Sequence, residues 1–167
     1  MSEFIEFSKP FVEGIQKVFE TMVFTKLEPG KPIIKSDRQA KGDISAIMGL
    51  IGTVEVEGTD REFQGMFLLT WETDVYVKIA SAMLMEEYTD FNDQIEDVGA
   101  EIANIVTGNA KRTLTQMGFK IEMAVPSTVT GKGHCFKYPS GTTTIMVPLS
   151  CVHGDFVMEL CYQSHND

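Results

Sequence analysis

The sequence predicts an α+β fold made of two similar halves, each a long helix followed by strands. Two observations point to it. Residues 8–26 and 90–118 each repeat apolar side chains at helical spacing, and each is followed by apolar, β-branched segments separated by short turns. We expect the strands to form a largely antiparallel sheet, with the two long helices covering one of its faces.

Residues 90–118 carry the most regular pattern in the chain. Their apolar side chains recur every three or four positions and so form one stripe on a helix. Asp90 or Asn92 is expected to cap this helix, and Gly118 is expected to end it. The stripe, which should face the core, consists of Ile95, Val98, Ile102, Ile105, Val106, Ala110, Leu114 and Met117.

The opposite side of the same helix presents Asp97, Glu101, Asn104 and Gly108. At about 100° per residue, Glu101 and Asn104 lie only about 60° apart, so an acid and an amide point outward together. Such a face is most often simply solvated. However, Asn costs a helix roughly 0.6 kcal/mol relative to Ala and Gly costs about 1 kcal/mol, while a bare backbone lets another surface approach closely. The pattern therefore permits a docking site on this face.

Periodicity and turn residues define the other elements. In the N-terminal helix, Ser8 is the expected cap and Pro10 suits the first turn. After Gly118 the order of a helix followed by strands repeats, so we expect an architectural duplication. The first half comprises a helix over 8–26, a hairpin of strands 44–56 and 62–71 with its turn at 57–60, and a shorter helix over 73–85. The second half adds a strand over 119–125, an irregular stretch over 126–141, and a hairpin of strands 142–151 and 156–163 joined by 152–155.

Length and composition limit the class of protein. A chain of 167 residues with 43% hydrophobic and 23% charged residues suits one globular domain spanning 1–167. No apolar run approaches the ~20 residues of a membrane span, and the N-terminus MSEFIEF lacks the features of a signal peptide, so we expect a cytoplasmic protein. A net charge of −10 opposes binding to nucleic acid or anionic membranes and leaves room for a protein partner with basic side chains.

Few residues suggest metal or nucleophile chemistry. The three cysteines are odd in number and lack CxxC spacing, so we interpret them as reduced, packed thiols. The three histidines are scattered, so no metal site is expected, and no nucleophile paired with a histidine is legible. Residues 131–133 lack the frame of a phosphate loop and are predicted to form a turn. The residues concerned are Cys135, Cys151, Cys161, His134, His153 and His165.

The pair Glu101 and Asn104 carries a resemblance to a known family. Residues 101–110, EIANIVTGNA, look like the ExxN helix and following Gly-Asn of the CheC, CheX and FliY family of chemotaxis phosphatases, and residues 9–22 look like its opening helix. The resemblance extends over the whole chain and is closest to CheX. It implies a hydrolase whose substrate is a phosphorylated response regulator, typically CheY, and whose action on the phosphoaspartate ends a chemotaxis signal.

The resemblance also implies roles for individual residues. Asn104 would orient the attacking water and Glu101 would pair with a lysine of the regulator, while Asp97 and Gly108 would help to shape the partner-binding surface. The chain would bind no cofactor of its own, because the regulator already holds Mg²⁺. The N-terminal helix imitates the motif with Gln16, three residues after a glutamate. Since Gln is longer and more mobile than Asn, we expect one site per chain.

The oligomeric state and two alternative functions can also be inferred. By the same resemblance, CheX-like proteins pair through their sheets, and the apolar strands 145–149 and 157–160 are long for an exposed edge, so a homodimer is predicted. The alternative function is a non-catalytic adaptor that binds a response regulator or a flagellar switch component. Turnover of a phosphorylated regulator distinguishes the enzyme from the adaptor. A ligand-binding sensor domain would need a convergent polar pocket, of which the sequence gives no sign.

Overall fold

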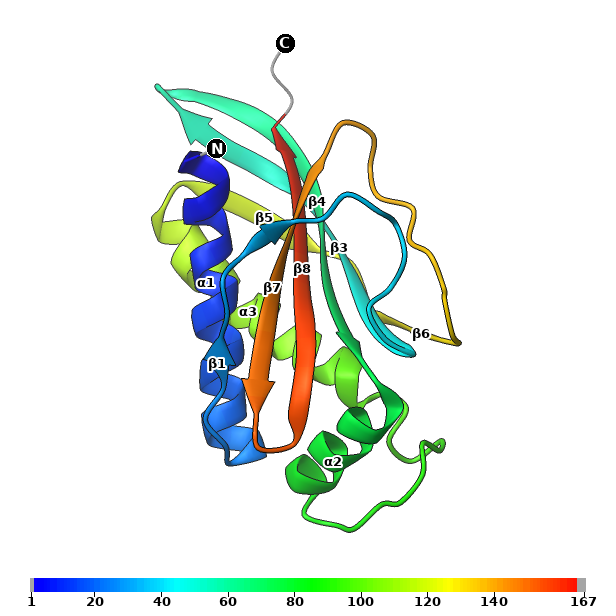
Figure 1. Cartoon of the computed structure of the whole chain (residues 1–167). Helices are drawn as coiled ribbons and strands as arrows, with labels where there is room; N and C mark the ends of the chain where they lie inside the picture. The colour runs from blue at the N-terminus through cyan, green and yellow to red at the C-terminus, as the bar shows by residue number, and fades with distance from the viewer. Residues whose placement is uncertain (1, 165–167) are drawn as a thin grey trace.

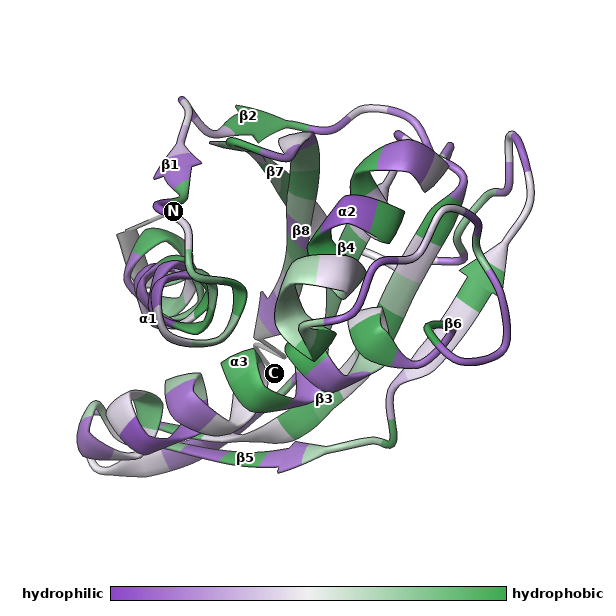
Figure 2. Cartoon of the chain, turned by 90° about the horizontal axis from the view of Figure 1, so that it is seen from below, coloured by the Kyte–Doolittle hydropathy of each residue, from purple (hydrophilic) through white to green (hydrophobic). Residues whose placement is uncertain are grey.

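The sheet of this protein curves around two of its helices. In the computed structural model, which describes residues 2–164, α1 and α3 lie on the concave side of the sheet (Figures 1 and 2). The helical elements are α1 (Ser2–Val18), continued by a short π-helix η1 (Phe19–Val23), α2 (Thr73–Leu84) and α3 (Val98–Gln116). The strands are β1 (Glu28–Pro29), β2 (Ile33–Ile34), β3 (Ile44–Val56), β4 (Thr59–Trp71), β5 (Phe119–Met123), β6 (Ser127–Thr130), β7 (Thr143–Cys151) and β8 (Gly154–Ser164).

The order of the strands is palindromic. Within residues 2–164 the order is β1-β7-β8-β4-β3-β5, with β2 also paired to β7 and β6 also paired to β3, and the pairings are antiparallel. Exchanging β1 with β5, β3 with β7 and β4 with β8 reverses this order. Each half therefore adds its first strands to the hairpin of the other half, and the predicted α+β class is confirmed.

Both hairpins turn more tightly than predicted. Glu57 and Gly58 alone separate β3 from β4, with φ angles of 51° and 77°. Val152 and His153 alone separate β7 from β8. The predicted four-residue turns are wrong, because strand pairing continues to a two-residue turn in each hairpin. At Glu57 and Gly58 the positive φ angles match the twist of the antiparallel strands.

α1 begins earlier than the sequence pattern suggested. It starts at Ser2, so Ser8 and Pro10 lie inside the helix rather than at its cap and first turn. Phe4 and Phe7 account for this extension, because both are buried and the ring of Phe7 stacks 4.7 Å from that of Tyr162. Burial of two aromatic side chains outweighs the main-chain hydrogen bond that a proline removes.

The two long helices approach each other closely at Gly14. A Cβ at this position would lie 3.3 Å from the carbonyl oxygen of Val106, so the bare backbone of α1 packs directly on α3. The apolar stripe predicted over 90–118 is buried, except that Ile105 is half-buried and Met117 is 40% exposed. Within the described residues, none of the helices has the length and apolar character needed to cross a membrane.

Two segments, 33–43 and 131–142, cover the other face of the sheet, and we call them the straps. They are joined through the main chain, since the N–H of Ala40 donates to His134 O and the N–H of Phe136 donates to Arg38 O, each at 2.9 Å. The prediction that 126–141 is irregular is wrong in part, because β6 forms there and pairs with β3. β6 depends on its pairing with β3, which lies about eighty residues earlier in the sequence.

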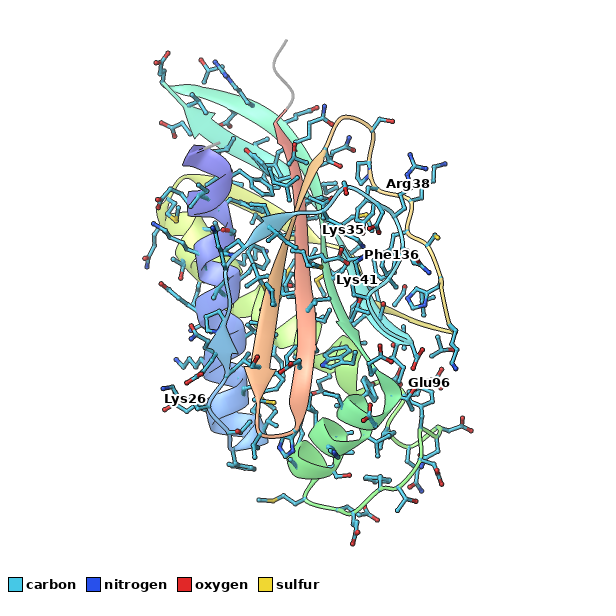
Figure 3. All side chains as sticks on the ribbon, in the orientation of Figure 1. Lys26, Lys35, Arg38, Lys41, Glu96 and Phe136 are labelled. Atoms are coloured by element: carbon cyan, nitrogen blue, oxygen red, sulfur yellow. The ribbon has the colours of Figure 1, made fainter. Side chains whose placement is uncertain are left out.

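A buried ion pair lies beneath the straps. The Lys35 ammonium contacts the Glu159 carboxylate of β8, with the two side chains only 1% and 0% exposed. The Lys35 Nζ also donates to the Tyr138 hydroxyl at 3.0 Å and lies 5.5 Å from the centre of the Phe136 ring. Figure 3 shows Lys35 and Phe136 on the strap side of the sheet. This face is therefore held partly by charge, whereas the concave face is filled by apolar side chains.

Strands β7 and β8 are not exposed edges of the sheet. β8 lies between β7 and β4, while β1 and β2 pair with the outer side of β7. One of the two grounds for the predicted homodimer, an exposed edge at strands 145–149 and 157–160, is therefore wrong. The homodimer that the resemblance implies stays a prediction.

Candidate functional site

Three of the predicted site residues border one hollow of about 600 Å³. Glu101 and Asn104 of α3, with Asp97 immediately before the helix, form one of its sides. The opposite side is residues 123–126, which connect β5 to β6. Gly108 lies one helical turn beyond Asn104 and does not line the hollow, and a Cβ added there would meet nothing within 4 Å.

α3 begins at Val98, later than predicted. Asp90 and Asn92 do not cap it, and the Asn92 side chain instead accepts a main-chain N–H two residues further on, at 2.8 Å. Residues 93–97 form turns that lead into the helix. As a result, Glu101 lies in the first turn, where the positive end of the helix dipole favours a carboxylate.

Tyr76 of α2 fixes the start of α3. Its hydroxyl accepts the N–H of Gly99 at 2.8 Å and shares its own proton between the carbonyl oxygens of Ile95 and Glu96, at 2.9 and 2.8 Å. Burial raises the pKa of this hydroxyl to about 12, so it stays a donor at neutral pH. A Cβ at Gly99 would lie 2.8 Å from the Trp71 ring, so only glycine allows this contact. The helix that carries Glu101 and Asn104 is thereby held in place.

The side chains of Glu101 and Asn104 are free to meet a partner. Both residues are exposed, and among residues 2–164 neither side chain forms a hydrogen bond or an ion pair. An amide donates and accepts hydrogen bonds at the same time and does not titrate, while an unpaired carboxylate can accept a cation from another molecule. The pair can therefore orient a small polar molecule and bind a basic group side by side.

The similar motif on α1 has different surroundings. Glu13 is exposed, but Gln16 is half-buried and its amide donates to the carbonyl oxygen of Leu27 at 3.4 Å. A separate hollow of about 560 Å³ adjoins Gln16 and is lined also by Glu20, Phe24, Thr25, Lys26 and Leu27. The amide of this second motif is thus occupied within its own chain.

The structure brings together a serine and a histidine that are far apart in the sequence. Ser45 Oγ lies 2.8 Å from both His134 Nε2 and Thr70 Oγ1, and His134 Nδ1 lies 2.6 Å from the carbonyl oxygen of Gly131. Ser45 is fully buried, so a substrate has no access to its hydroxyl. The pair therefore anchors a strap to β3 and β4, and 131–133 is the turn that the sequence predicted.

The other histidine and the cysteines that the structure describes form no metal-binding cluster. Within residues 2–164, no group of three or more His, Cys, Asp or Glu side chains is placed to hold a metal ion, and His165 lies outside the described residues. Cys161 is buried, which raises the pKa of its thiol to about 11. Cys135 is exposed, so the prediction that the cysteines are packed thiols is wrong there. Cys135 lies in a strap, where its thiol donates weakly to the carbonyl oxygen of Gly133 at 3.8 Å.

Sequence reasoning missed two parts of the site. One is Tyr76, whose contact with α3 spans about twenty residues and leaves no periodic signal. The other is the wall at 123–126, which was predicted as the end of the strand 119–125 and the first residue of an irregular stretch. The dipeptide Val125-Pro126 was its only available signal, since proline interrupts strand pairing.

Comparison with known proteins identifies the family. A family model described as chemotaxis phosphatase CheX matches residues 45–150, well over half of the chain. The chain belongs to the CheX family. This CheX membership confirms the resemblance inferred from the ExxN segment and the opening helix.

Solved structures of CheX and CheC-like proteins match almost the whole chain. A CheC-like superfamily protein from Shewanella sp. PV-4 is 32% identical, with a TM-score of 0.82, over 95% of this chain and 98% of that one. Chemotaxis protein CheX from Vibrio vulnificus is 34% identical, with a TM-score of 0.80, over 95% and 99%. A chain of the CheX–CheY–BeF3–Mg²⁺ complex from Borrelia burgdorferi is 26% identical, with a TM-score of 0.74, over 96% and 98%. Among curated proteins, none matches the chain.

Proposed function

We propose that this CheX-family protein hydrolyses the phosphoaspartate of a CheY-like response regulator and so ends a chemotaxis signal. The observation that carries the proposal is the pair Glu101 and Asn104, exposed side by side on a fixed helix and without a partner among residues 2–164. Family membership and the assembly of CheX with CheY in Borrelia burgdorferi support a response regulator as the substrate.

In the proposed reaction, Asn104 enters the regulator's phosphorylation site and orients a water molecule in line with the phosphorus–oxygen bond to aspartate. The water oxygen bonds to phosphorus, the aspartyl oxygen leaves as a carboxylate, and the proton of the water passes to phosphate or solvent. The acyl phosphate is already activated by the regulator's own Mg²⁺ and lysine, so positioning is the main contribution required of the phosphatase. No nucleophile on this chain is needed.

Glu101 binds the regulator through charge in this proposal. Its carboxylate pairs with the lysine beside the phosphoaspartate, which places the amide of Asn104, one turn further along α3, against the phosphoryl group. Asp97 borders the same hollow and adds negative charge. Gly108 leaves the helix surface bare where the regulator approaches.

Turnover tests the proposal directly. A phosphorylated CheY-like regulator is mixed with this protein at a hundredth of its concentration, and release of inorganic phosphate is followed with and without EDTA. We expect many phosphates per chain, and dependence on Mg²⁺ that is bound by the regulator, because this chain is proposed to bind no cofactor itself. Binding without release above the regulator's own rate would instead identify an adaptor.

We further infer a homodimer, as the resemblance to CheX implies. The outermost strand β2 offers a surface other than β7 and β8, since Ile33 and Ile34 are 47% and 62% exposed on it. Light scattering at micromolar concentration should give twice the mass of the chain, and Ile34→Lys should lower that mass if β2 is used. A monomeric mass that is unchanged on concentration would refute the inference.

A further inference from the structure

The wall of the hollow that faces Asn104 carries the most exposed large apolar side chain among residues 2–164. Val125 is 87% exposed. Val125 and the adjoining Pro126 line the same hollow as Glu101 and Asn104. A single exposed valine is common on protein surfaces, and what distinguishes Val125 is its place beside Glu101 and Asn104 at the same hollow.

A β-bulge places Val125 there. β3 pairs its residue Leu50 with Met123 and its residue Ile47 with Ser127. Two residues of β3 lie between these pairs, whereas three residues, 124–126, lie on the opposing side. One extra residue on one strand is a bulge, which interrupts pairing and redirects a side chain.

The bulge is a fixed feature and not a loose loop. The N–H of Ala124 donates to the carbonyl oxygen of Gly49 at 3.0 Å, and pairing with β3 resumes at Ser127. Pro126 restricts φ and has no N–H to donate. The chain is therefore held on both sides of Val125, and the valine projects from a rigid base, which lowers the entropy lost on binding.

Charge across the hollow indicates what covers this surface. Asp97 and Glu101 supply negative charge, and no basic residue of the described part of the chain lines the hollow. A group that fits must be basic where it meets Glu101 and apolar where it meets Val125. A response regulator meets both conditions when its lysine pairs with Glu101 and an apolar side chain beside that lysine contacts Val125.

We propose that Val125, supported by Pro126, is an apolar docking contact for the phosphorylated response regulator and helps to determine which regulator is accepted. The proposal rests on the proposed function for its occupant. Val125 lines the hollow from a different segment than the amide and has an apolar side chain, so in this proposal it stabilises the bound regulator equally before and during reaction. Its loss therefore changes affinity and KM, while kcat is retained.

The test compares Val125→Asp with Val152→Asp, both made in the full chain. Val152 is a matched control, because it is 81% exposed at the turn between β7 and β8 and does not line the hollow. Binding of a fluorescently labelled CheY-like regulator activated with BeF3 and Mg²⁺ gives Kd, and phosphate release gives kcat and KM. Melting temperatures show that each variant is folded.

We expect Val125→Asp to raise Kd and KM about tenfold or more with kcat within about twofold, and Val125→Ile to stay near wild type. Val152→Asp should change neither constant more than about twofold. The proposal is overturned if Val125→Asp binds as the wild type does, or if both aspartate variants weaken binding equally. If the wild type binds but does not turn over, the enzymatic function fails while the Kd comparison still judges the docking contact.

Discussion

Two helices of this protein carry a glutamate followed three residues later by an amide, yet only one presents both side chains to solvent. On α3, Glu101 and Asn104 are exposed and without a partner among residues 2–164. On α1, the amide of Gln16 is half-buried and bonded to Leu27 O. A short motif therefore gains its chemistry from the segment that lies next to it. Residue type and spacing alone do not decide whether the motif is open to a partner.

The neighbouring segments differ because the two halves continue differently. After α1 the chain passes through η1 and reverses at Phe24, which has a φ of 60°, so that Leu27 is buried next to Gln16. Beside α3 the bulge at 124–126 borders a hollow that Glu101 and Asn104 also line. The two halves share a topology, yet the amide of one motif is bonded within the chain (the occupied motif) and the amide of the other is exposed to solvent (the open motif).

The largest expected effect is at the open motif. Asn104→Ala should lower kcat by about 100-fold or more, because the amide acts mainly in the transition state. Binding of the BeF3-activated regulator should be nearly unchanged. The measurement is single-turnover phosphate release alongside Kd, with thermal melting as a control, since losing an exposed Asn should raise helix stability by a few tenths of a kcal/mol. Wild-type activity at an unchanged melting temperature would sink the assignment.

Glu101→Ala should have the next largest effect, and a different kinetic signature. Losing the charge partner of the regulator's lysine weakens docking and also misplaces Asn104, so KM should rise while kcat falls, with kcat/KM lowered about tenfold or more. Raising the salt concentration should weaken the wild type more than the variant, because screening acts on the charge pair that the variant lacks. Identical salt dependence of the two proteins would argue against a charge contact.

Tyr76→Phe tests whether fixing the start of α3 matters to the site. The change leaves the N–H of Gly99 and two carbonyl groups without their hydroxyl partner, which should cost about 1–3 kcal/mol of unfolding free energy and lower kcat several-fold. Because burial raises the pKa of Tyr76 to about 12, an unfolded chain loses this proton near pH 10 while the folded chain keeps it.

The difference in the pKa of Tyr76 between the folded and unfolded states decides whether stability rises or falls with pH. Between about pH 10 and 12 the folded state holds the Tyr76 proton and the unfolded state does not, so stability falls as pH rises. Tyr76→Phe lacks that contribution. The stability gap between wild type and variant, measured by urea unfolding, should therefore narrow above pH 10, and a constant gap would contradict the buried hydroxyl.

The smallest expected effect is at the occupied motif. Gln16→Ala should leave kcat and KM within about twofold, since its amide is bonded inside the chain at 3.4 Å and contributes only weakly to stability. Phosphate release by this variant is measured beside Asn104→Ala. If Gln16→Ala abolished turnover, the contrast between the two helices would be reversed.

The sequence predicted what depends on local spacing. The stripe on α3, the outward pair Glu101 and Asn104, and the strand β3 all follow from periods of about 3.6 or 2 residues. The parts it did not predict depend on distant neighbours. The start of α3 is set by Tyr76, β6 by its pairing with β3, and the burial of Lys35 by Glu159 on β8. No local pattern reports such contacts.

The palindromic sheet has a consequence for how the chain is made. β1 and β2 have no partner in their own half, because both pair with β7, which is synthesised more than a hundred residues later. Lys35 likewise has to wait for Glu159 before it can leave water. The N-terminal half can therefore form its β3–β4 hairpin on the ribosome but keeps an unfinished edge until the second half emerges. During that interval the unpaired edge is open to pairing with other chains, and charged side chains on it oppose such pairing.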